Sequence, residues 1–321
     1  MTVTTFSELE LDESLLEALQ DKGFTRPTAI QAAAIPPALD GRDILGSAPT
    51  GTGKTAAYLL PALQHLLDFP RKKSGPPRIL ILTPTRELAM QVADHARELA
   101  KHTHLDIATI TGGVAYMNHA EVFSENQDIV VATTGRLLQY IKEENFDCRA
   151  VETLILDEAD RMLDMGFIED IERIAEALPA GRQTVMVSAT FAGQVGRLAD
   201  QILKDDAQRI EVANHTDSHA NIEQQLLWAD DLDHKSALLE NLLTSTEMQQ
   251  AVIFTSTQRD ADELAAHLYE MGHAVAPLHG GMPQGRRNRT LMALRRGELR
   301  ILVATDVAAR GIDVPTITHV F

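Results

Sequence analysis

The chain has 321 residues, of which 44% are hydrophobic, and it carries a formal net charge of −17. Its length is enough for two domains of about 100 to 200 residues, each with its own core. The single cysteine, Cys148, excludes an internal disulfide, and no apolar run approaches the ~18 residues of a membrane span. The N-terminus lacks the basic start and apolar stretch of a signal peptide, so we expect a cytoplasmic protein without a membrane segment.

The charge is unevenly distributed along the chain. Residues 251–321 contain eight Arg against seven Asp or Glu, so the acidity lies in the first 250 residues. Phosphate backbones are bound through clustered Lys and Arg, and a strongly acidic chain offers few such clusters. If the protein binds a polyanion, it must do so through local groups.

Short apolar runs alternate with helical apolar spacing over the first two thirds of the sequence. The runs predict buried strands at residues 44–47, 79–82, 129–132, 154–156 and 184–187. The spacing predicts helices at residues 56–67, 86–100, 136–142, 167–178 and 193–203. Such alternation is typical of an α/β fold in which right-handed crossovers build a doubly wound parallel sheet. We assign this first domain to residues 1–204.

The alternation stops in a polar stretch, residues 205–220, which we interpret as a linker containing one short strand. It resumes with predicted strands at 251–254, 274–278 and 301–304 and helices at 260–270 and 285–295. Residues 221–321 therefore predict a second α/β domain. Because the sequence ends at a strand-like run, which would leave an unpaired edge and an uncovered face, we expect this second domain to be incomplete.

A glycine-rich loop follows the first predicted strand and opens a helix, which is the context of a phosphate-binding loop. The loop would surround phosphate oxygens with its backbone and consists of Ala48, Pro49, Thr50, Gly51, Thr52 and Gly53. Lys54 would reach the terminal phosphates, and the Thr55 hydroxyl would bind Mg²⁺. Ala48 departs from the usual pattern, which begins with glycine.

An acidic motif follows the strand at residues 154–156. Asp157 would hold Mg²⁺, directly or through water, and Glu158 would polarise the attacking water. The alternative for such residues is a structural helix cap, and Asp160 fits that role. With the glycine loop, the motif predicts an ATPase whose catalytic residues are Lys54, Thr55, Asp157 and Glu158.

Residues 157–160, Asp-Glu-Ala-Asp, resemble the signature of the DEAD-box RNA helicases of superfamily 2, and further motifs follow in the family's order over nearly the whole chain. The resemblance implies two RecA-like domains that close on ATP and RNA. Phe6 and residues 23–31 resemble the Q motif, which implies that Phe24, Arg26 and Gln31 contact the nucleotide and that Gln31 recognises adenine. Alternatively, Thr28 and Gln31 form a capping box at a helix start; the two roles are compatible.

The resemblance also implies contacts with the RNA sugar-phosphate backbone rather than with bases. It assigns them to residues that follow strands in both domains: Pro84, Thr85, Arg86, Gly113, Thr133, Gly135, Arg136, Gly280, Arg287 and Thr305. Thr134 stands where the family usually has proline, which puts the local turn in question. For Arg86, pairing with a surface carboxylate is the alternative.

Coupling between ATP and RNA is implied for Asp160, Ser188 and Thr190, and Gly311 and Asp313 would face the nucleotide. Ser188 and Thr190 could hydrogen-bond to the acidic motif, or could simply cap the following helix. The family's arginine-rich motif VI does not occur up to Phe321. We therefore expect residues 1–321 to bind adenine nucleotide but to show little RNA-stimulated hydrolysis.

The predicted function is ATP-dependent local unwinding of RNA duplexes, with ATP and Mg²⁺ as cofactors. Phe6 and the Met-Gly-Phe sequence at residues 165–167 are compatible with the bacterial SrmB or RhlE groups, which implies ribosomal RNA as a partner and a role in ribosome assembly. Two alternatives stay open: a phosphate-loop DNA helicase or translocase, and a nucleotide-gated RNA clamp or scaffold without turnover.

Overall fold

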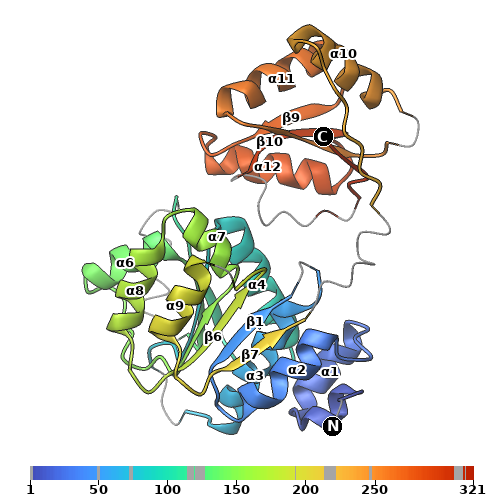
Figure 1. Ribbon diagram of the computed structural model, residues 1–321. Helices are drawn as coiled ribbons and strands as arrows, with labels where there is room; N and C mark the ends of the chain where they lie inside the picture. The colour runs from blue at the N-terminus through green and yellow to red at the C-terminus, as the bar shows by residue number, and fades with distance from the viewer. Residues whose placement is uncertain are drawn as a thin grey trace. The chain divides into compact units, whose positions relative to one another are not determined.

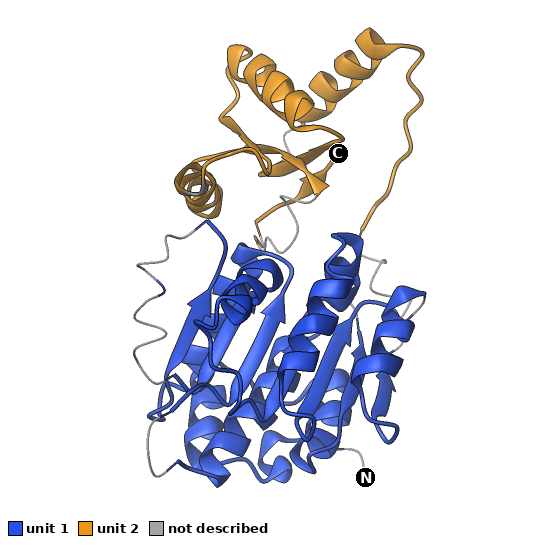
Figure 2. Cartoon of the chain, turned by 90° about the vertical axis from the view of Figure 1, so that its left-hand side faces the viewer, with its two compact units in different colours: residues 1–218 blue, residues 219–321 orange. Residues whose placement is uncertain are grey.

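The structure is a computed structural model that describes residues 3–48, 51–71, 75–113, 119, 127–191, 193–212, 222–245, 248–306, 314 and 316–321. The chain divides into two compact units, Met1–Ser218 and His219–Phe321, which are coloured separately in Figure 2.

The described residues of the first unit form a sheet of seven parallel strands in the order β3-β4-β2-β5-β6-β1-β7 (Figure 1). The strands are β1 (Ile44–Ser47), β2 (Ile79–Thr83), β3 (Ile107–Ile110), β4 (Ile129–Thr133), β5 (Thr153–Leu156), β6 (Gln183–Ser188) and β7 (Gln208–Glu211). Because every pairing is parallel, the carboxyl ends of all the strands lie along one edge of the sheet.

Helices cover both faces of this sheet. Successive strand residues point to opposite faces, so Ile79 and Ile81 join one core while Leu80 and Leu82 join the other. The first core is closed by η1 (Phe6–Leu9), α1 (Glu13–Asp21), α2 (Ala29–Leu39), α3 (Lys54–Asp68) and α4 (Arg86–Leu99). The second is closed by α6 (Thr134–Lys142), α7 (Ala159–Asp164), α8 (Ile168–Ala177) and α9 (Gln194–Ile202). The predicted doubly wound architecture is confirmed.

The first sheet continues beyond the domain boundary predicted at residue 204. β7 pairs with β1 along its whole length, and the first compact unit extends to Ser218. The short strand expected in a linker is thus an edge strand of the sheet. Its alternate residues are exposed, which gave it the polar character of a linker. β3 lies at the opposite edge and was absent from the predicted strands for a related reason, since only half of its residues are buried.

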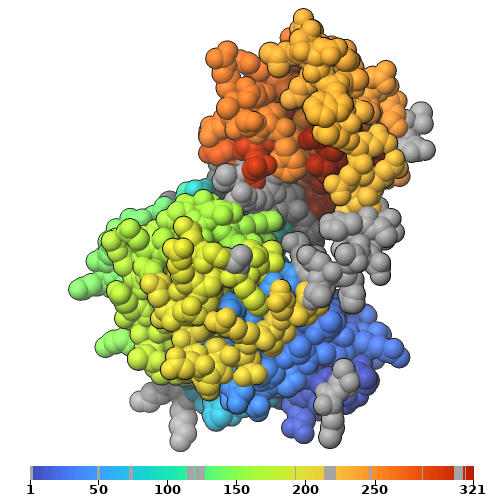
Figure 3. Space-filling view, in the orientation of Figure 1, coloured from blue at the N-terminus to red at the C-terminus, as the bar shows by residue number. Residues whose placement is uncertain are grey.

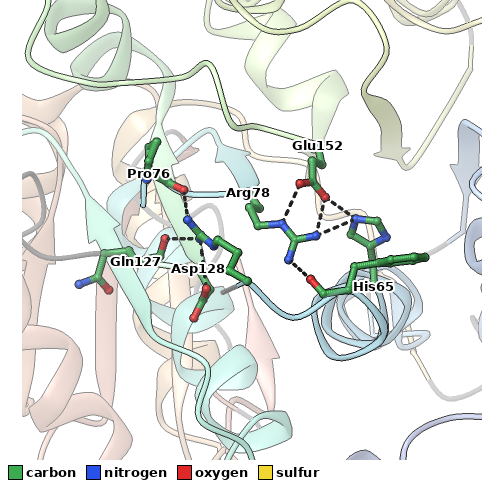
Figure 4. A network of polar contacts seen from close by, with 8 residues as sticks. His65, Pro76, Arg78, Gln127, Asp128 and Glu152 are labelled. Carbon is green, nitrogen blue, oxygen red and sulfur yellow. Dashed lines mark hydrogen bonds and ion pairs between the residues drawn. The ribbon is translucent and has the colours of Figure 1, made fainter. Parts of the chain in front are cut away.

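The amino-terminal edge of the sheet is held by buried and half-buried ion pairs (Figure 4). Arg78, just before β2, donates from Nε and Nη2 to the Glu152 carboxylate at 2.8 and 2.7 Å. His65 Nε2 lies 2.6 Å from the same carboxylate. Arg71 pairs with Asp128 at 3.2 Å. These contacts tie the starts of β2, β4 and β5 to the end of α3.

The described residues of the second unit form a parallel sheet in the order β11-β8-β10-β9. Its strands are β8 (Ala251–Thr255), β9 (Val275–Leu278), β10 (Ile301–Thr305) and β11 (His319–Val320), and its helices are α10 (Leu232–Leu243), α11 (Gln258–Glu270) and α12 (Gln284–Arg295). α10 and α11 pack on one face and α12 on the other. The three strands and two helices predicted here are confirmed.

Apolar side chains are exposed just before α10, in the gold part of the surface of the second unit (Figure 3). Leu226 is 78% and Trp228 83% exposed. This stretch carries no regular secondary structure in the described residues, so its apolar side chains show no helical or strand periodicity.

Candidate functional site

The glycine loop after β1 leads into α3, as its sequence predicted. Gly51 and Gly53 have φ values of 82° and 89°, in the left-handed region that favours glycine, and Gly53 caps the helix that Lys54 begins. The Lys54 ammonium donates to the Ala48 carbonyl at 2.8 Å, across the mouth of the loop. The loop is therefore closed on its own lysine. Of the predicted loop residues, Pro49 and Thr50 lie outside the described part of the chain.

Gln31 joins the start of α2 to this loop. Its Oε1 accepts from the Thr28 backbone N–H at 2.9 Å, and its Nε2 donates to the Gly53 carbonyl at 3.0 Å. The predicted capping box is confirmed, and the same amide also reaches the phosphate loop. A Cβ on Gly53 would overlap the Gln31 amide, which is a second reason for glycine there. Phe24 and Arg26 lie in the exposed segment between α1 and α2.

Asp157 follows β5 and is 3% exposed. Its Oδ2 accepts a hydrogen bond of 2.8 Å from the Tyr58 hydroxyl. Burial raises the pKa of Asp157, while the Tyr58 hydroxyl and the Lys54 charge act against that rise. Tyr58 was missed at the sequence level. Its position four residues after Lys54, on the same face of α3, is the signal that could have found it.

Glu158 occupies the turn between β5 and α7 in a left-handed conformation, with φ 55° and ψ 52°. A non-glycine residue in this region stores about 1–3 kcal/mol of strain. Arg161, also missed at the sequence level, donates to Glu158 Oε2 at 2.8 Å. Burial raises the pKa of Glu158, and Arg161 opposes this effect.

The alternative structural role of Asp160 is not supported. The N-terminal cap of α7 is Glu158, and Asp160 lies inside the first turn of the helix. A carboxylate in that turn still interacts favourably with the positive end of the helix dipole, but it does not cap the helix.

The Ser-Ala-Thr segment at the end of β6 contacts the base of the phosphate loop. The Ala48 N–H donates to the Ser188 carbonyl at 3.4 Å, and the Ser47 hydroxyl donates to the Ala189 carbonyl at 3.1 Å. Ser188 Oγ accepts from the Thr190 N–H at 3.3 Å. These bonds join the segment to the loop that would hold the nucleotide, and α9 is capped by Gly193 rather than by either hydroxyl residue.

Three of the predicted RNA-binding turns lie together after β2, β3 and β4. Pro84 leads into Thr85, which caps α4 by accepting from the Leu88 N–H at 3.2 Å, so that Arg86 starts the helix. The Arg86 guanidinium lies against the Gly112–Gly113 turn: a Cβ on Gly113 would overlap it. Thr133 Oγ1 accepts from the Gly112 N–H at 3.2 Å. The structure thus brings Thr85, Arg86, Gly113 and Thr133 into one group.

The turn at Thr134 keeps a regular helix start despite the missing proline. Thr133 caps α6, and Thr134 is its first residue, the position at which proline is favoured. The exposed Gly135 follows. Arg136 donates to a neighbouring glutamine on α6 at 3.2 Å, and its guanidinium lies 5.5 Å from the Tyr140 ring centroid.

The strand order separates these groups along the carboxyl edge of the sheet. The loop after β1 and the segments after β6 and β5 are neighbours, and the turns after β2, β4 and β3 follow on the other side of β5. The edge therefore offers a phosphate-binding part and an adjoining part rich in backbone N–H groups and arginines, as expected for the ligand crevice of an open α/β sheet.

In the second unit, Gly280 follows β9 and Thr305 ends β10, the neighbouring strand. Arg287 is 9% exposed and donates to the His279 carbonyl at 3.2 Å. Gln258, missed at the sequence level, lies against Gly280: a Cβ there would be 3.6 Å from its Nε2. Gly311 and Asp313 lie outside the described residues.

Neither a cluster of metal-binding side chains nor a membrane-spanning helix is found among the described residues. They contain no group of three or more His, Cys, Asp or Glu side chains placed to hold a metal ion. Their helices include none that is long and apolar enough to cross a membrane.

The sequence matches two family models. Residues 28–198 match the DEAD/DEAH box helicase family, and residues 234–321 match the helicase conserved C-terminal domain. The chain is 70% identical over 322 residues to the ATP-dependent RNA helicase SrmB of Escherichia coli, covering 100% of this chain and 72% of that protein. It is 54% identical over 320 residues to SrmB of Haemophilus influenzae, covering 100% of this chain and 73% of that protein.

Solved structures agree with the sequence matches. Dbp5 of S. cerevisiae bound to RNA and ADP BeF3 has a TM-score of 0.88 at 30% identity, covering 99% of this chain and 80% of that chain. A DEAD box protein of Methanococcus jannaschii has a TM-score of 0.61 at 36% identity, covering 97% of this chain and 82% of that chain. The chain is a member of the DEAD/DEAH box helicase family, in which the predicted resemblance to SrmB is confirmed.

Proposed function

We propose that this chain is a cytoplasmic ATP-dependent RNA helicase that uses ATP to separate short RNA duplexes, with ribosomal RNA as its target. The observation that carries the proposal is the arrangement at one sheet edge: the phosphate loop with buried Asp157 and Glu158, beside the arginine-bearing turns after β2 and β4. The SrmB relatives, named as ATP-dependent RNA helicases, support both the reaction and the choice of RNA.

In this proposal, the nucleotide replaces contacts that the loop residues make with one another. Lys54 would exchange the Ala48 carbonyl for a phosphate oxygen, because an ammonium binds an anionic oxygen more strongly than a neutral carbonyl. Gln31 would present its amide to the adenine edge, while its hydrogen bond to Gly53 connects base recognition to the phosphate loop. Glu158 would accept a hydrogen bond from the attacking water.

Mg²⁺ fits the side chains found beside the loop. A threonine hydroxyl and a carboxylate, Thr55 and Asp157, provide the oxygen ligands that this ion prefers. An Mg²⁺ ion held by one or two protein ligands takes its remaining ligands from phosphates and water. When bound, the ion would neutralise charge on the phosphates.

RNA would be held by its backbone in the adjoining part of the edge. The N-termini of α4 and α6 and the Gly112–Gly113 turn lie at the strand ends, and Arg86 and Arg136 stand in the first turns of the two helices. Such donors bind phosphates without reading sequence. An acidic chain can therefore bind RNA through a small part of its surface.

The test is separation of a short labelled RNA duplex by the protein at its full natural length. We expect separation with ATP, and none with Glu158→Gln, which should still bind nucleotide and RNA. RNA binding that responds to ATP without any duplex separation would support the clamp alternative instead. Faster separation of ribosomal RNA duplexes than of unrelated duplexes would support the proposed target, and equal rates would contradict it.

A further inference from the structure

His119 lies between two of the proposed RNA-binding turns and is 3% exposed. Its Nε2 is 3.4 Å from the backbone nitrogen of Thr111, and its Nδ1 is 2.8 Å from the Tyr140 hydroxyl. The His119 and Tyr140 rings meet edge to face, with centroids 5.6 Å apart and planes at 81°. Both ring nitrogens are therefore used.

The contact with Thr111 fixes the tautomer of this histidine. A backbone N–H can only donate, so Nε2 must be the acceptor and the proton of the neutral ring must be on Nδ1. Nδ1–H then donates to the Tyr140 oxygen. Burial, together with the charge of Arg136, lowers the pKa of His119, in agreement with a neutral ring.

The two partners of His119, Thr111 and Tyr140, each lie next to a proposed RNA-binding residue. Thr111 directly precedes the Gly112–Gly113 turn against which Arg86 packs. Tyr140 lies one helical turn after Arg136 on α6, and the guanidinium lies 5.5 Å from its ring centroid. A continuous path of contacts thus connects the turn after β3 with the arginine after β4.

We propose that His119 is a positioning residue for RNA binding, which acts by fixing the Tyr140 ring under Arg136. The inference rests on the proposed RNA role of Arg136. An arginine that is already stacked on a fixed ring loses less side-chain freedom when it binds a phosphate, so the contact becomes tighter. His119 itself is enclosed and would not touch the RNA.

The experiment is a double-mutant cycle of His119→Phe and Arg136→Gln. His119→Phe keeps an aromatic ring but removes both hydrogen bonds. The affinity for a fluorescent single-stranded RNA is measured with a non-hydrolysable ATP analogue at several salt concentrations. We expect His119→Phe to weaken binding on the order of 5-fold, within the range for residues in one hydrogen-bond network. In the Arg136→Gln background it should cause no further loss.

The salt dependence gives a readout that a general loss of structure would not imitate. Both single variants should reduce the slope of log affinity against log salt, by about 0.7 for a full loss of one phosphate contact on a single strand. Fluorescent ADP should bind all variants equally, because the nucleotide loop follows β1 and the changed residues lie after β3 and β4. As a matched control, His95→Phe replaces an exposed histidine on α4 and should leave RNA affinity unchanged.

Two further variants protect the test against misfolding of His119→Phe. Tyr140→Phe removes only the hydroxyl that receives the His119 proton and should weaken RNA binding in the same direction. His119→Gln retains a donor and an acceptor and should restore part of the affinity. Unchanged RNA affinity in His119→Phe and Tyr140→Phe, or losses that add to that of Arg136→Gln, would overturn the positioning role. If Arg136→Gln alone has no effect, the proposed RNA contact itself fails.

Discussion

Asp157 and Glu158 are adjacent in sequence but are held by different partners. Asp157 accepts a hydrogen bond from the Tyr58 hydroxyl on α3, whereas Glu158 forms an ion pair with Arg161, three residues further along the chain. Burial raises the pKa of both carboxyl groups. The separate partners agree with separate tasks, one at the phosphates and one at the attacking water.

Glu158→Gln removes the proposed acceptor for the water proton but keeps the shape of the side chain. Hydrolysis should fall by about 10²- to 10⁴-fold, the usual effect of a general base, while ATP still binds. Lys54→Ala should instead weaken nucleotide binding itself. Single-turnover hydrolysis and fluorescent-nucleotide titration separate the two effects. Lys101→Ala, which changes a surface lysine paired with Asp21, is the control and should alter neither.

Tyr58→Phe removes a hydroxyl from a buried carboxylate. Because Asp157 would lose a donor that water cannot replace, the first unit should lose about 1–3 kcal/mol of stability. Urea unfolding measures the change. Tyr269→Phe, at a side chain that is 70% exposed, should change stability by less than about 0.5 kcal/mol. Equal losses of stability in the two variants would show that the buried Tyr58–Asp157 hydrogen bond does not stabilise the fold.

At the scale of elements, the turns that follow the strands determine how the arginines at the helix starts are placed. A Cβ on Gly113 would displace the Arg86 guanidinium from the Gly112–Gly113 turn, and the φ of 70° at Gly113 strains any residue other than glycine. Gly113→Ala should therefore destabilise the first unit by about 1–3 kcal/mol and weaken RNA binding. Gly181→Ala, where a Cβ meets nothing within 4 Å, should be nearly neutral. Thermal unfolding and RNA titration of the two variants test this.

The opposite edge of the sheet should respond to pH. Burial pushes the pKa of Glu152 upward, but hydrogen bonds from Arg78 and His65 outweigh it and leave the pKa below the ordinary glutamate value. A lowered folded-state pKa contributes stability above the unfolded pKa, and this stability is lost as pH falls through the folded value. Arg78→Met should reduce stability near neutral pH and flatten its decline below about pH 4.3. Urea midpoints of the wild type and of Arg78→Met are measured from pH 3 to 7. If the midpoints of the two proteins decline in parallel as the pH falls, the proposed role of Arg78 is wrong.

The same elements show how far the sequence could predict the fold and the site. Central strands such as β2 and β5 are buried on both faces, so their continuous apolar runs identified them almost to the residue. β3 and β7 are half exposed and carry no such run. Lys54, Asp157 and Arg86 were found because they lie in motifs. Tyr58, Arg161 and His119 were not found as site residues, because only the packing of distant segments gives them their partners.

At the scale of the whole molecule, a net charge of −17 must be reconciled with RNA binding. The proposed contacts include three cationic side chains, Arg86, Arg136 and Arg287, with neutral donors for the rest. Three neutralised phosphates on a single strand predict a slope near −2 for log affinity against log salt, at about −0.7 per contact. RNA titrations from low to moderate salt measure it. A slope of about −5 or steeper would require a larger basic surface than these residues provide.

The central claim is that one sheet edge joins an adenine-nucleotide site to an RNA-backbone site. The most direct measurement is the affinity of the protein for single-stranded RNA and for DNA of the same sequence, each with and without a non-hydrolysable ATP analogue. We predict that the analogue strengthens RNA binding at least about 10-fold, a coupling of roughly 1.4 kcal/mol, and leaves DNA binding weak. DNA binding as tight as RNA binding, or an RNA affinity that is the same with and without the ATP analogue, would contradict the account.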